Sequence, residues 1–192
     1  PKSAVVVMPP SWEWDDIQEL REFHDKGFYR WMPHINLLYP FYEDGTTDFK
    51  DAISKLESAC RTIKPFELRL SSFDFFEHGP KSSTIWLKPE SANHRKQTND
   101  EPLRRLHGVL LDACPECDDL SNDKERGIIE FSPHLSVGQW RGTKDAVDAV
   151  KTLAKDWSPL EFTVDSIYII SRTTYSSSFD VRWKIPLGPS GK

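Results

Sequence analysis

The chain contains 192 residues, of which 38% are hydrophobic and 29% charged, and its formal net charge is −5 at pH 7. This length suits a single domain or a duplicated one, and the composition is typical of a globular protein rather than a disordered chain. No apolar stretch approaches the roughly 20 residues of a membrane span, so we expect no membrane contact. The acidic balance argues against a broad nucleic-acid-binding surface, which needs a basic excess.

The cysteines, Cys60, Cys114 and Cys117, bear on the compartment. The apolar run over residues 4–8 has no basic lead, so it does not resemble a signal peptide. An odd cysteine count without such a signal favours a reducing compartment, and we expect the cytoplasm, with the nucleus as the alternative. Cys114 and Cys117 have CxxC spacing, but a zinc site needs two further ligands at partner spacing. We therefore expect two thiols at a helix end and no metal.

Strands and helices alternate along the chain. Short β-branched or alternating runs predict strands, and apolar residues at helical spacing predict helices. In chain order, we expect a strand over 4–8, a helix over 14–24, a strand over 31–40, a helix over 48–63, strands over 66–76 and 84–87, a polar loop over 88–101, a helix over 102–113, an acidic loop over 115–127, a strand over 128–140, a helix over 144–157, and strands over 162–170 and 181–185.

One short sequence occurs twice. PHINL at residues 33–37 resembles PHLSV at residues 133–137, and each copy is followed by a helix and then by an alternating strand. We therefore predict an α+β fold of duplicated strand-helix-strand lobes, mainly antiparallel, with pseudo-twofold symmetry around a central cleft. Residues 1–192 would form a single bilobal domain whose two halves meet at that cleft, with the two histidine strands side by side.

The repeated residues suit phosphodiester chemistry. On a strand, residues i and i+2 point to the same face, so His34 would share a face with Asn36, and His134 with Ser136. A neutral imidazole can take a proton from water or a ribose hydroxyl, while an imidazolium gives one to the departing oxygen. Asn36 and Ser136 can donate to the phosphate oxygens as charge builds there. This set requires no metal or other cofactor.

On these two motifs the chain resembles the two-histidine (2H) phosphoesterase superfamily, also called the LigT-like or 2′-5′ RNA ligase-like family. The resemblance covers the order of elements from about residue 4 to residue 187. The family motif is a histidine, an apolar residue, Thr or Ser, and another apolar residue; the copy at His134 fits, and the copy at His34 departs from it at Asn36. An amide can still donate to phosphate.

The resemblance implies a bilobal fold with a central cleft and no required metal. Family activities include opening 2′,3′-cyclic nucleotides, trimming RNA 3′ ends and cleaving 2′,5′-linked oligoadenylate. It also implies a basic or aromatic residue near the strand that ends at residue 170, where Arg172 and Tyr175 lie. Arg172 could hold a phosphate oxygen, or it could be a solvated arginine at a strand end.

Three aromatic residues that follow the motifs are candidates for base contact. Tyr39, Phe41 and Trp140 could stack on a nucleobase, although aromatic side chains at strand ends more often pack in the core. We therefore predict a monomeric phosphodiesterase that acts on a nucleotide or a short RNA. The alternative is a non-catalytic module that binds an RNA end or a nucleotide in the same cleft.

Overall fold

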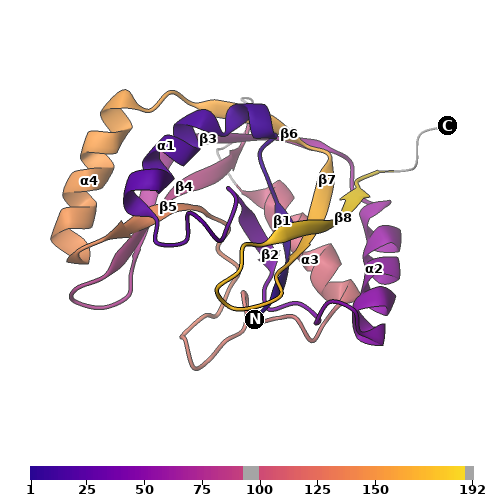
Figure 1. Ribbon diagram of the computed structural model, residues 1–192. Coiled ribbons are helices and arrows are strands. Elements are labelled where there is room, and N and C mark those ends of the chain that lie inside the picture. Colours follow the sequence, from indigo (N-terminus) through magenta and orange to yellow (C-terminus); the bar gives the residue numbers. More distant parts are fainter. Residues whose placement is uncertain (93–99, 189–192) are drawn as a thin grey trace.

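The computed structural model describes residues 1–92 and 100–188. These residues form strands and α-helices with one short 3-10 helix, η1 (Figure 1). In chain order the elements are β1 (Ser3–Val7), η1 (Ser11–Glu13), α1 (Asp15–His24), β2 (Ile35–Leu38), α2 (Thr47–Cys60), β3 (Phe66–Glu77), β4 (Ser83–Ser91), α3 (Glu101–Ala113), β5 (Leu135–Trp140), α4 (Gly142–Asp156), β6 (Leu160–Val164), β7 (Ser166–Ser171) and β8 (Asp180–Pro186).

The strands make two four-stranded antiparallel sheets with matching layouts. The first sheet has the order β2-β1-β7-β8, and the second has the order β5-β4-β3-β6. A strand that follows a histidine motif, β2 or β5, therefore lies at one edge of each sheet. The first sheet takes its strands from the two ends of the chain, and the second takes its strands from the middle. The predicted α+β fold with duplicated antiparallel sheets is confirmed.

The two histidine strands, expected side by side, are edge strands of different sheets and are not hydrogen-bonded to each other. β2 pairs with β1, and β5 pairs with β4. The two edge strands nevertheless contact each other where the sheets meet. Apolar alternation in the sequence shows that both segments are strands with one buried face, but it carries no information about which strand supplies the hydrogen-bonding partner.

Four expected elements differ clearly from the structure. The strand expected over 31–40 is limited to Ile35–Leu38. The strand expected over 84–87 continues to Ser91, because β3 pairs with it along its whole length. The strand expected over 128–140 begins only at Leu135, since Pro133 has no N–H for a ladder. The run over 162–170 divides at Asp165 into β6 and β7, which belong to different sheets. Of the loop expected over 88–101, residues 93–99 lie outside the described part.

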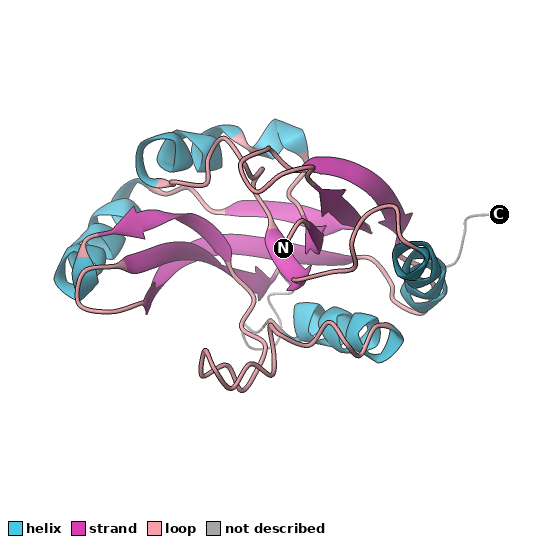
Figure 2. Cartoon of the chain, turned by 60° about the horizontal axis from the view of Figure 1, so that its bottom comes forward, coloured by secondary structure: helices cyan, strands magenta, loops and turns pink. Residues whose placement is uncertain are grey.

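The helices cover the outer faces of the sheets (Figure 2). α2 and α3 pack together and contact β8 and β2 of the first sheet, whereas α1 contacts β5 and α4 contacts β3 and β4 of the second. Figure 1 shows α4 and α2 at opposite ends of the molecule. Within the described residues, no helix is long and apolar enough to cross a membrane.

The first sheet has two differently packed faces. On β2, Ile35 and Leu37 join the main hydrophobic core, and Asn36 between them points to the other face. That other face carries a smaller apolar cluster that includes Val6, which is the register partner of Asn36 on β1. The alternation therefore places the polar residue of the first motif on the face away from the main core.

Candidate active site

His34 and His134 are held in the same way. Each lies immediately before its strand and is half-buried. The Nδ1 atom of His34 is 2.7 Å from the carbonyl oxygen of Met32, and that of His134 is 2.8 Å from the carbonyl oxygen of Ser132. A carbonyl only accepts, so Nδ1 carries the proton in both neutral rings. Nε2 is therefore the nitrogen of each ring that can exchange a proton with another molecule.

Aromatic rings pack against both imidazoles. Trp31 stacks on His34 with ring centroids 4.5 Å apart and planes 15° apart. Phe76 of β3 meets His134 edge to face at 4.9 Å, and Trp86 of β4 lies 5.9 Å from it. These rings remove water from the imidazoles and restrict their rotation. The sequence analysis did not identify any of the three, because a single sequence does not distinguish such an aromatic residue from an ordinary core residue.

Burial lowers the pKa of both histidines. It lowers the pKa of His34 to about 4, against the opposing effect of the bond to the Met32 carbonyl. The charges of Arg21 and His134 lower this pKa further, and that of Asp25 raises it. Burial also lowers the pKa of His134. The influence of His134 on His34 places the two imidazoles within electrostatic reach of each other, although their strands belong to different sheets.

The other two motif residues differ in their contacts. The Nδ2 atom of Asn36 is 3.3 Å from Nε2 of His34, and its Oδ1 atom is buried without a partner in the described chain. Ser136 pairs in register with Trp86, so the two side chains share a face of the second sheet. The indole Nε1 of Trp86 is buried and has no partner among the described residues. Trp86 of β4 therefore has, on the same sheet face as Ser136 of the neighbouring strand β5, an N–H donor for which the described residues supply no partner.

Tyr39 and Arg172 both lie on the His34 side. The Trp31 ring that stacks on His34 also contacts Tyr39 at 5.5 Å and Phe179 at 3.9 Å. The guanidinium of Arg172 lies over the ring of Phe179, 4.6 Å from the ring centroid. Its Nη1 and Nη2 donate to backbone carbonyls, and its Nε is buried without a partner in the residues described. One chain of contacts thus connects His34 with Arg172.

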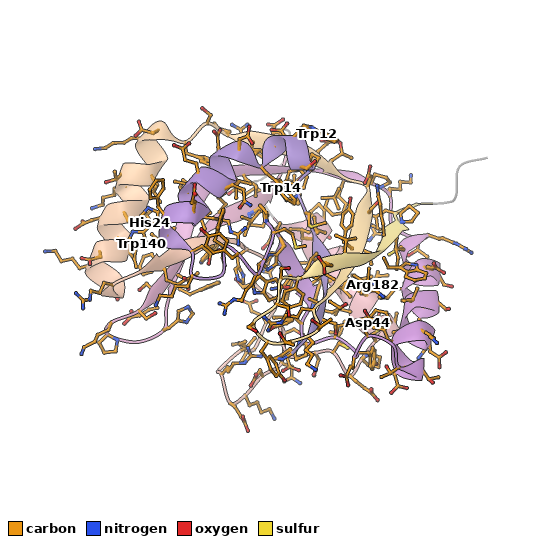
Figure 3. All side chains as sticks on the ribbon, in the orientation of Figure 1. Trp12, Trp14, His24, Asp44, Trp140 and Arg182 are labelled. Carbon is orange, nitrogen blue, oxygen red and sulfur yellow. The ribbon has the colours of Figure 1, made fainter. Side chains whose placement is uncertain are left out.

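Trp140 and Tyr175 lie farther from the histidines. Trp140 stacks on His24 at the end of α1, with centroids 4.4 Å apart, and Figure 3 shows the two side by side. Tyr175 is 64% exposed, and the guanidinium of Arg172 lies 5.6 Å from its ring. None of the ring contacts described joins Trp140 or Tyr175 to His34 or His134.

A buried ion pair on α1 supports the His34 side. Arg21 Nε is 2.8 Å from Asp25 Oδ2, and the two side chains are only 2% and 8% exposed. Arg21 also donates to the carbonyl oxygen of Trp31 at 2.8 Å. Asp25 accepts from Gln139 of β5 at 3.4 Å. This pair therefore connects the segment before His34 with the strand after His134. An Arg and an Asp four residues apart on a helix usually lie on its surface, so the sequence did not indicate this role.

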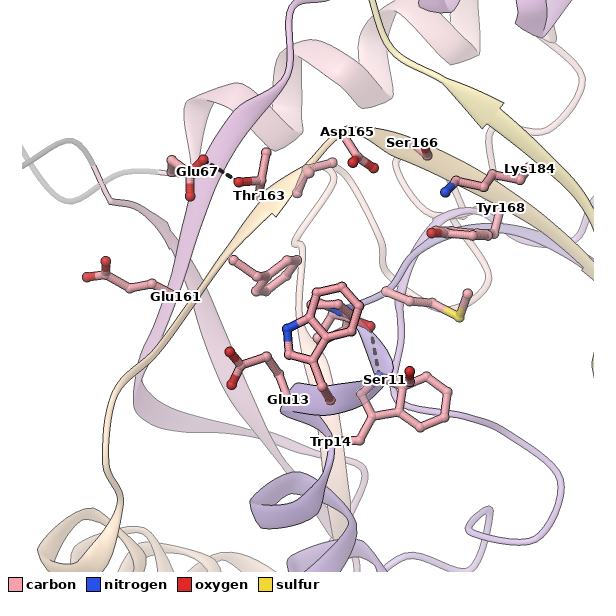
Figure 4. Close-up of a pocket in the computed structure, with 16 residues that line it drawn as sticks. Ser11, Glu13, Trp14, Glu67, Glu161, Thr163, Asp165, Ser166, Tyr168 and Lys184 are labelled. Carbon is pink, nitrogen blue, oxygen red and sulfur yellow. Dashed lines mark hydrogen bonds between the residues drawn. The ribbon is translucent and has the colours of Figure 1, made fainter.

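A separate cavity of ≈ 690 Å³ lies where β6 leads into β7 (Figure 4). Its walls come from the segment over residues 8–14, from β6 and β7, and from one residue each of β3 and β8. Its charged side chains are Glu13, Glu67, Glu161, Asp165 and Lys184. Neither candidate histidine lines it. Within the described residues, no cluster of His, Cys, Asp and Glu side chains could hold a metal ion, and Cys60, Cys114 and Cys117 are buried free thiols.

Comparison with known protein families matches the chain to the 2′-5′ RNA ligase superfamily over residues 8–175. The chain belongs to this superfamily. The prediction of a two-histidine phosphoesterase relationship, made from the motifs at His34 and His134, is confirmed at the level of the family.

Solved structures of this superfamily have the same fold. TT0787 of Thermus thermophilus is 18% identical, with a TM-score of 0.59, and the match covers 99% of this chain and 100% of that one. E. coli LigT in apo form is 16% identical, with a TM-score of 0.55 and 97% of each chain covered. E. coli LigT complexed with 3′-AMP is 14% identical, with a TM-score of 0.56 and 97% of each chain covered. No curated protein matches the chain.

Proposed function

We propose that this superfamily member is a metal-independent phosphodiesterase that uses His34 and His134 as its acid–base pair. The proposed substrate is a 2′,3′-cyclic nucleotide, an RNA 3′ end or a 2′,5′-linked oligonucleotide. The observation that carries the proposal is the matched geometry of the two imidazoles. Each has Nδ1 fixed to a carbonyl two residues earlier, so Nε2 is the nitrogen for proton transfer; in His34 it also has Asn36 Nδ2 at 3.3 Å, which substrate would have to displace. Family membership alone would not assign this role to these two residues.

The contacts of the two rings support different roles. His34 has the low pKa, about 4, and its Nε2 faces an amide N–H, so it is neutral and suited to be the base. We assign the acid to His134. In hydrolysis, water attacks phosphorus and gives its proton to His34. The bond from phosphorus to one ribose oxygen breaks, and His134, which must enter this step as an imidazolium with both ring nitrogens protonated, gives its Nε2 proton to that oxygen and keeps the Nδ1 proton. The product is a phosphomonoester beside a free hydroxyl.

Three donors are proposed to hold the phosphate, and two of them are N–H groups that substrate would have to reach beneath the surface. The Ser136 hydroxyl shares a face with the indole N–H of Trp86, which has no other partner in the described chain. The Nε of Arg172 is the third. Such donors stabilise charge that builds on the non-bridging oxygens, and this is the contribution that removes the need for a metal. Tyr39, Trp140 and Tyr175 are proposed contacts for the base or for a following nucleotide.

A nucleotide or short RNA is the proposed partner. E. coli LigT, which shares the fold, has been solved complexed with 3′-AMP and with phosphate. The net charge of −5 favours a small substrate over a long RNA backbone. We propose that the chain is a monomer. We also propose a cytoplasmic location, with the nucleus as the alternative, because free thiols such as Cys60, Cys114 and Cys117 suit a reducing compartment.

The test is incubation of the protein with EDTA, 2′,3′-cyclic nucleotides, and 2′,5′- and 3′,5′-linked oligonucleotides, followed by chromatography of the products. We expect turnover of at least one substrate in EDTA, with a loss of about 100-fold or more in His34→Gln and in His134→Gln. Circular dichroism would confirm that both variants fold. Full activity in either folded variant would contradict the assignment of that histidine.

The same experiment tests the second candidate, a non-catalytic module for nucleotides or RNA ends. Asn36 favours this candidate, because it replaces the hydroxyl residue of the family motif and its amide occupies Nε2 of His34. Such a module would bind a 2′- or 3′-phosphorylated nucleotide in equilibrium dialysis and leave every cyclic and oligomeric substrate intact.

A further inference from the structure

Asn36 is matched to one protonation state of His34. The neutral imidazole carries a single proton, and the bond from Nδ1 to the Met32 carbonyl requires that proton at Nδ1. Nε2 is then a bare acceptor. Asn36 Nδ2, an N–H donor, lies 3.3 Å from it. The present orientation of the amide therefore fits neutral His34 and conflicts with an imidazolium, whose Nε2–H would face the N–H groups of the amide.

The other end of the amide is unused. Asn36 Oδ1 is buried and has no hydrogen-bond partner in the described chain. A buried acceptor without a partner carries a free-energy cost, and in the present orientation Oδ1 is such an unsatisfied acceptor among the described residues. Half a turn about the Cβ–Cγ bond of Asn36 would exchange the places of Oδ1 and Nδ2 and bring Oδ1 to Nε2. No existing bond of Oδ1 would be lost, and the contact would become favourable once Nε2 carries a proton.

We propose that Asn36 is a positioning residue that follows the proton on His34. Its amide donates to Nε2 while His34 is neutral and, after a half turn, accepts from Nε2–H when His34 has taken the proton. The imidazole then keeps its orientation through both states. This proposal deepens the proposed function and rests on it for the step in which His34 acts as base.

The second motif has a hydroxyl residue, Ser136, at the position that corresponds to Asn36. A serine hydroxyl can donate or accept by rotating its single O–H bond. An amide separates the two capacities onto different atoms, so it has to turn. Asn36 can thus replace a hydroxyl residue at this position without losing either capacity. A leucine of similar size has neither capacity, and an aspartate can only accept.

In the described chain, the charged groups around His34 form no hydrogen bond with Asn36, so the effect of Asn36 on the pKa of His34 can be measured separately from theirs. Arg21 and Asp25 reach it from α1, and His134 reaches it from the segment before β5. Arg21 and Asp25 form an ion pair with each other, and their influences on His34 have opposite signs. Neither bonds to Asn36, so substitution of Asn36 leaves these groups in place.

The experiment is NMR on the full chain without substrate, with nitrogen-labelled side chains, as pH is lowered through the midpoint of His34. Above the midpoint, we expect nuclear Overhauser effects between the Asn36 amide protons and the His34 ring protons. Below it they should disappear, since the NH₂ group turns away. Persistence of the same effects on both sides of the midpoint would overturn the proposal. Because no turnover is involved, this result does not depend on whether the chain is an enzyme.

Three variants give a second, independent readout. In Asn36→Asp, the carboxylate should stabilise the imidazolium, so the pH midpoint of the His34 titration should rise by more than one pH unit. The acid limb of the pH–rate profile should shift to higher pH by the same amount. Asn36→Thr should keep kcat within about threefold, because its hydroxyl serves both states, whereas Asn36→Leu should lower kcat about tenfold or more with little change in KM. Equal kcat values in folded Asn36→Thr and Asn36→Leu would overturn the positioning role. Absence of turnover in the unaltered chain would instead contradict the proposed function.

Discussion

Trp31 lies flat against His34, with ring centroids 4.5 Å apart and planes 15° apart. The indole covers one face of the imidazole, and burial is the largest cause of the lowering of the His34 pKa to about 4. A charged imidazole is disfavoured where water is excluded, so His34 stays neutral over the physiological pH range. By stacking on the ring, Trp31 contributes to the burial that keeps it neutral.

Replacement of Trp31 by leucine should raise the pKa of His34. Water would reach the imidazole, and we expect an increase of about one pH unit or more, toward the unperturbed value near 6.5. An NMR titration of the His34 ring protons would measure it. Trp12→Leu is the matched control, because Trp12 is 79% exposed and contacts neither candidate histidine. An unchanged His34 midpoint in Trp31→Leu would show that burial by Trp31 is not the cause.

The low pKa of His34 should also make stability depend on pH. Its folded pKa, about 4, lies below the value near 6.5 expected when the chain is unfolded, so the unfolded chain binds the proton first as pH falls. The free energy of unfolding should therefore decrease between about pH 6.5 and pH 4, by at most about 1.4 kcal/mol per pH unit from this group. Urea unfolding at several pH values would measure the slope.

The control for that slope is His34→Gln, which cannot titrate. In this variant the decrease between about pH 6.5 and pH 4 should be smaller by the contribution of His34. His134 also has a lowered pKa and would leave a residual slope. Identical slopes in the variant and the unaltered chain would mean that His34 has the same pKa in the folded and unfolded states.

Gly138 on β5 allows α1 to approach this strand closely. Its φ is +154°, and a Cβ atom there would lie 2.5 Å from Cβ of His24. Gly138→Ala should therefore destabilise the chain by roughly 2 kcal/mol or more, since both the backbone and the helix have to shift. Gly108→Ala is the matched control: Gly108 lies inside α3 with nothing within 4 Å of its Cβ position. That variant should gain up to about 1 kcal/mol. Thermal melts of both variants would measure the difference.

The two strand motifs, at residues 33–37 and 133–137, could be interpreted from sequence because their alternation is a local pattern. Apolar residues at 35 and 37 bury one face of β2, so the face of Asn36 follows from the alternation alone. The duplication also follows, because each copy is followed by a helix of its own. The assignment of the chain to its family depended on these local patterns.

The partners of these residues could not be predicted, because they are distant in sequence. Trp86 becomes a neighbour of Ser136 only through the register between β4 and β5. Phe76 reaches His134 only because β3 pairs with β4. Such registers depend on the packing of whole sheets, and a single sequence shows only that these residues are aromatic and alternate along a strand.

The buried ion pair between Arg21 and Asp25 should contribute to the stability of the fold. Both side chains are almost fully buried. Arg21 donates to the carbonyl oxygen of Trp31, and Asp25 accepts from Gln139 of β5, so the pair connects these two segments. Arg21→Met should cost about 3–5 kcal/mol of unfolding free energy, because it leaves the Asp25 carboxylate buried without its cation. The double variant Arg21→Met with Asp25→Leu should recover much of that loss, since no unpaired charge remains.

The exposed pair of Arg69 and Glu161 provides the comparison. Its atoms are 3.2 Å apart, but the side chains are 32% and 47% exposed, so Arg69→Met should cost no more than about 1 kcal/mol. Urea unfolding of these variants would separate the two cases. If Arg21→Met cost as little as Arg69→Met, water would have to reach Asp25 in the folded chain. The pair would then no longer explain how the segment before His34 and the strand after His134 are held together.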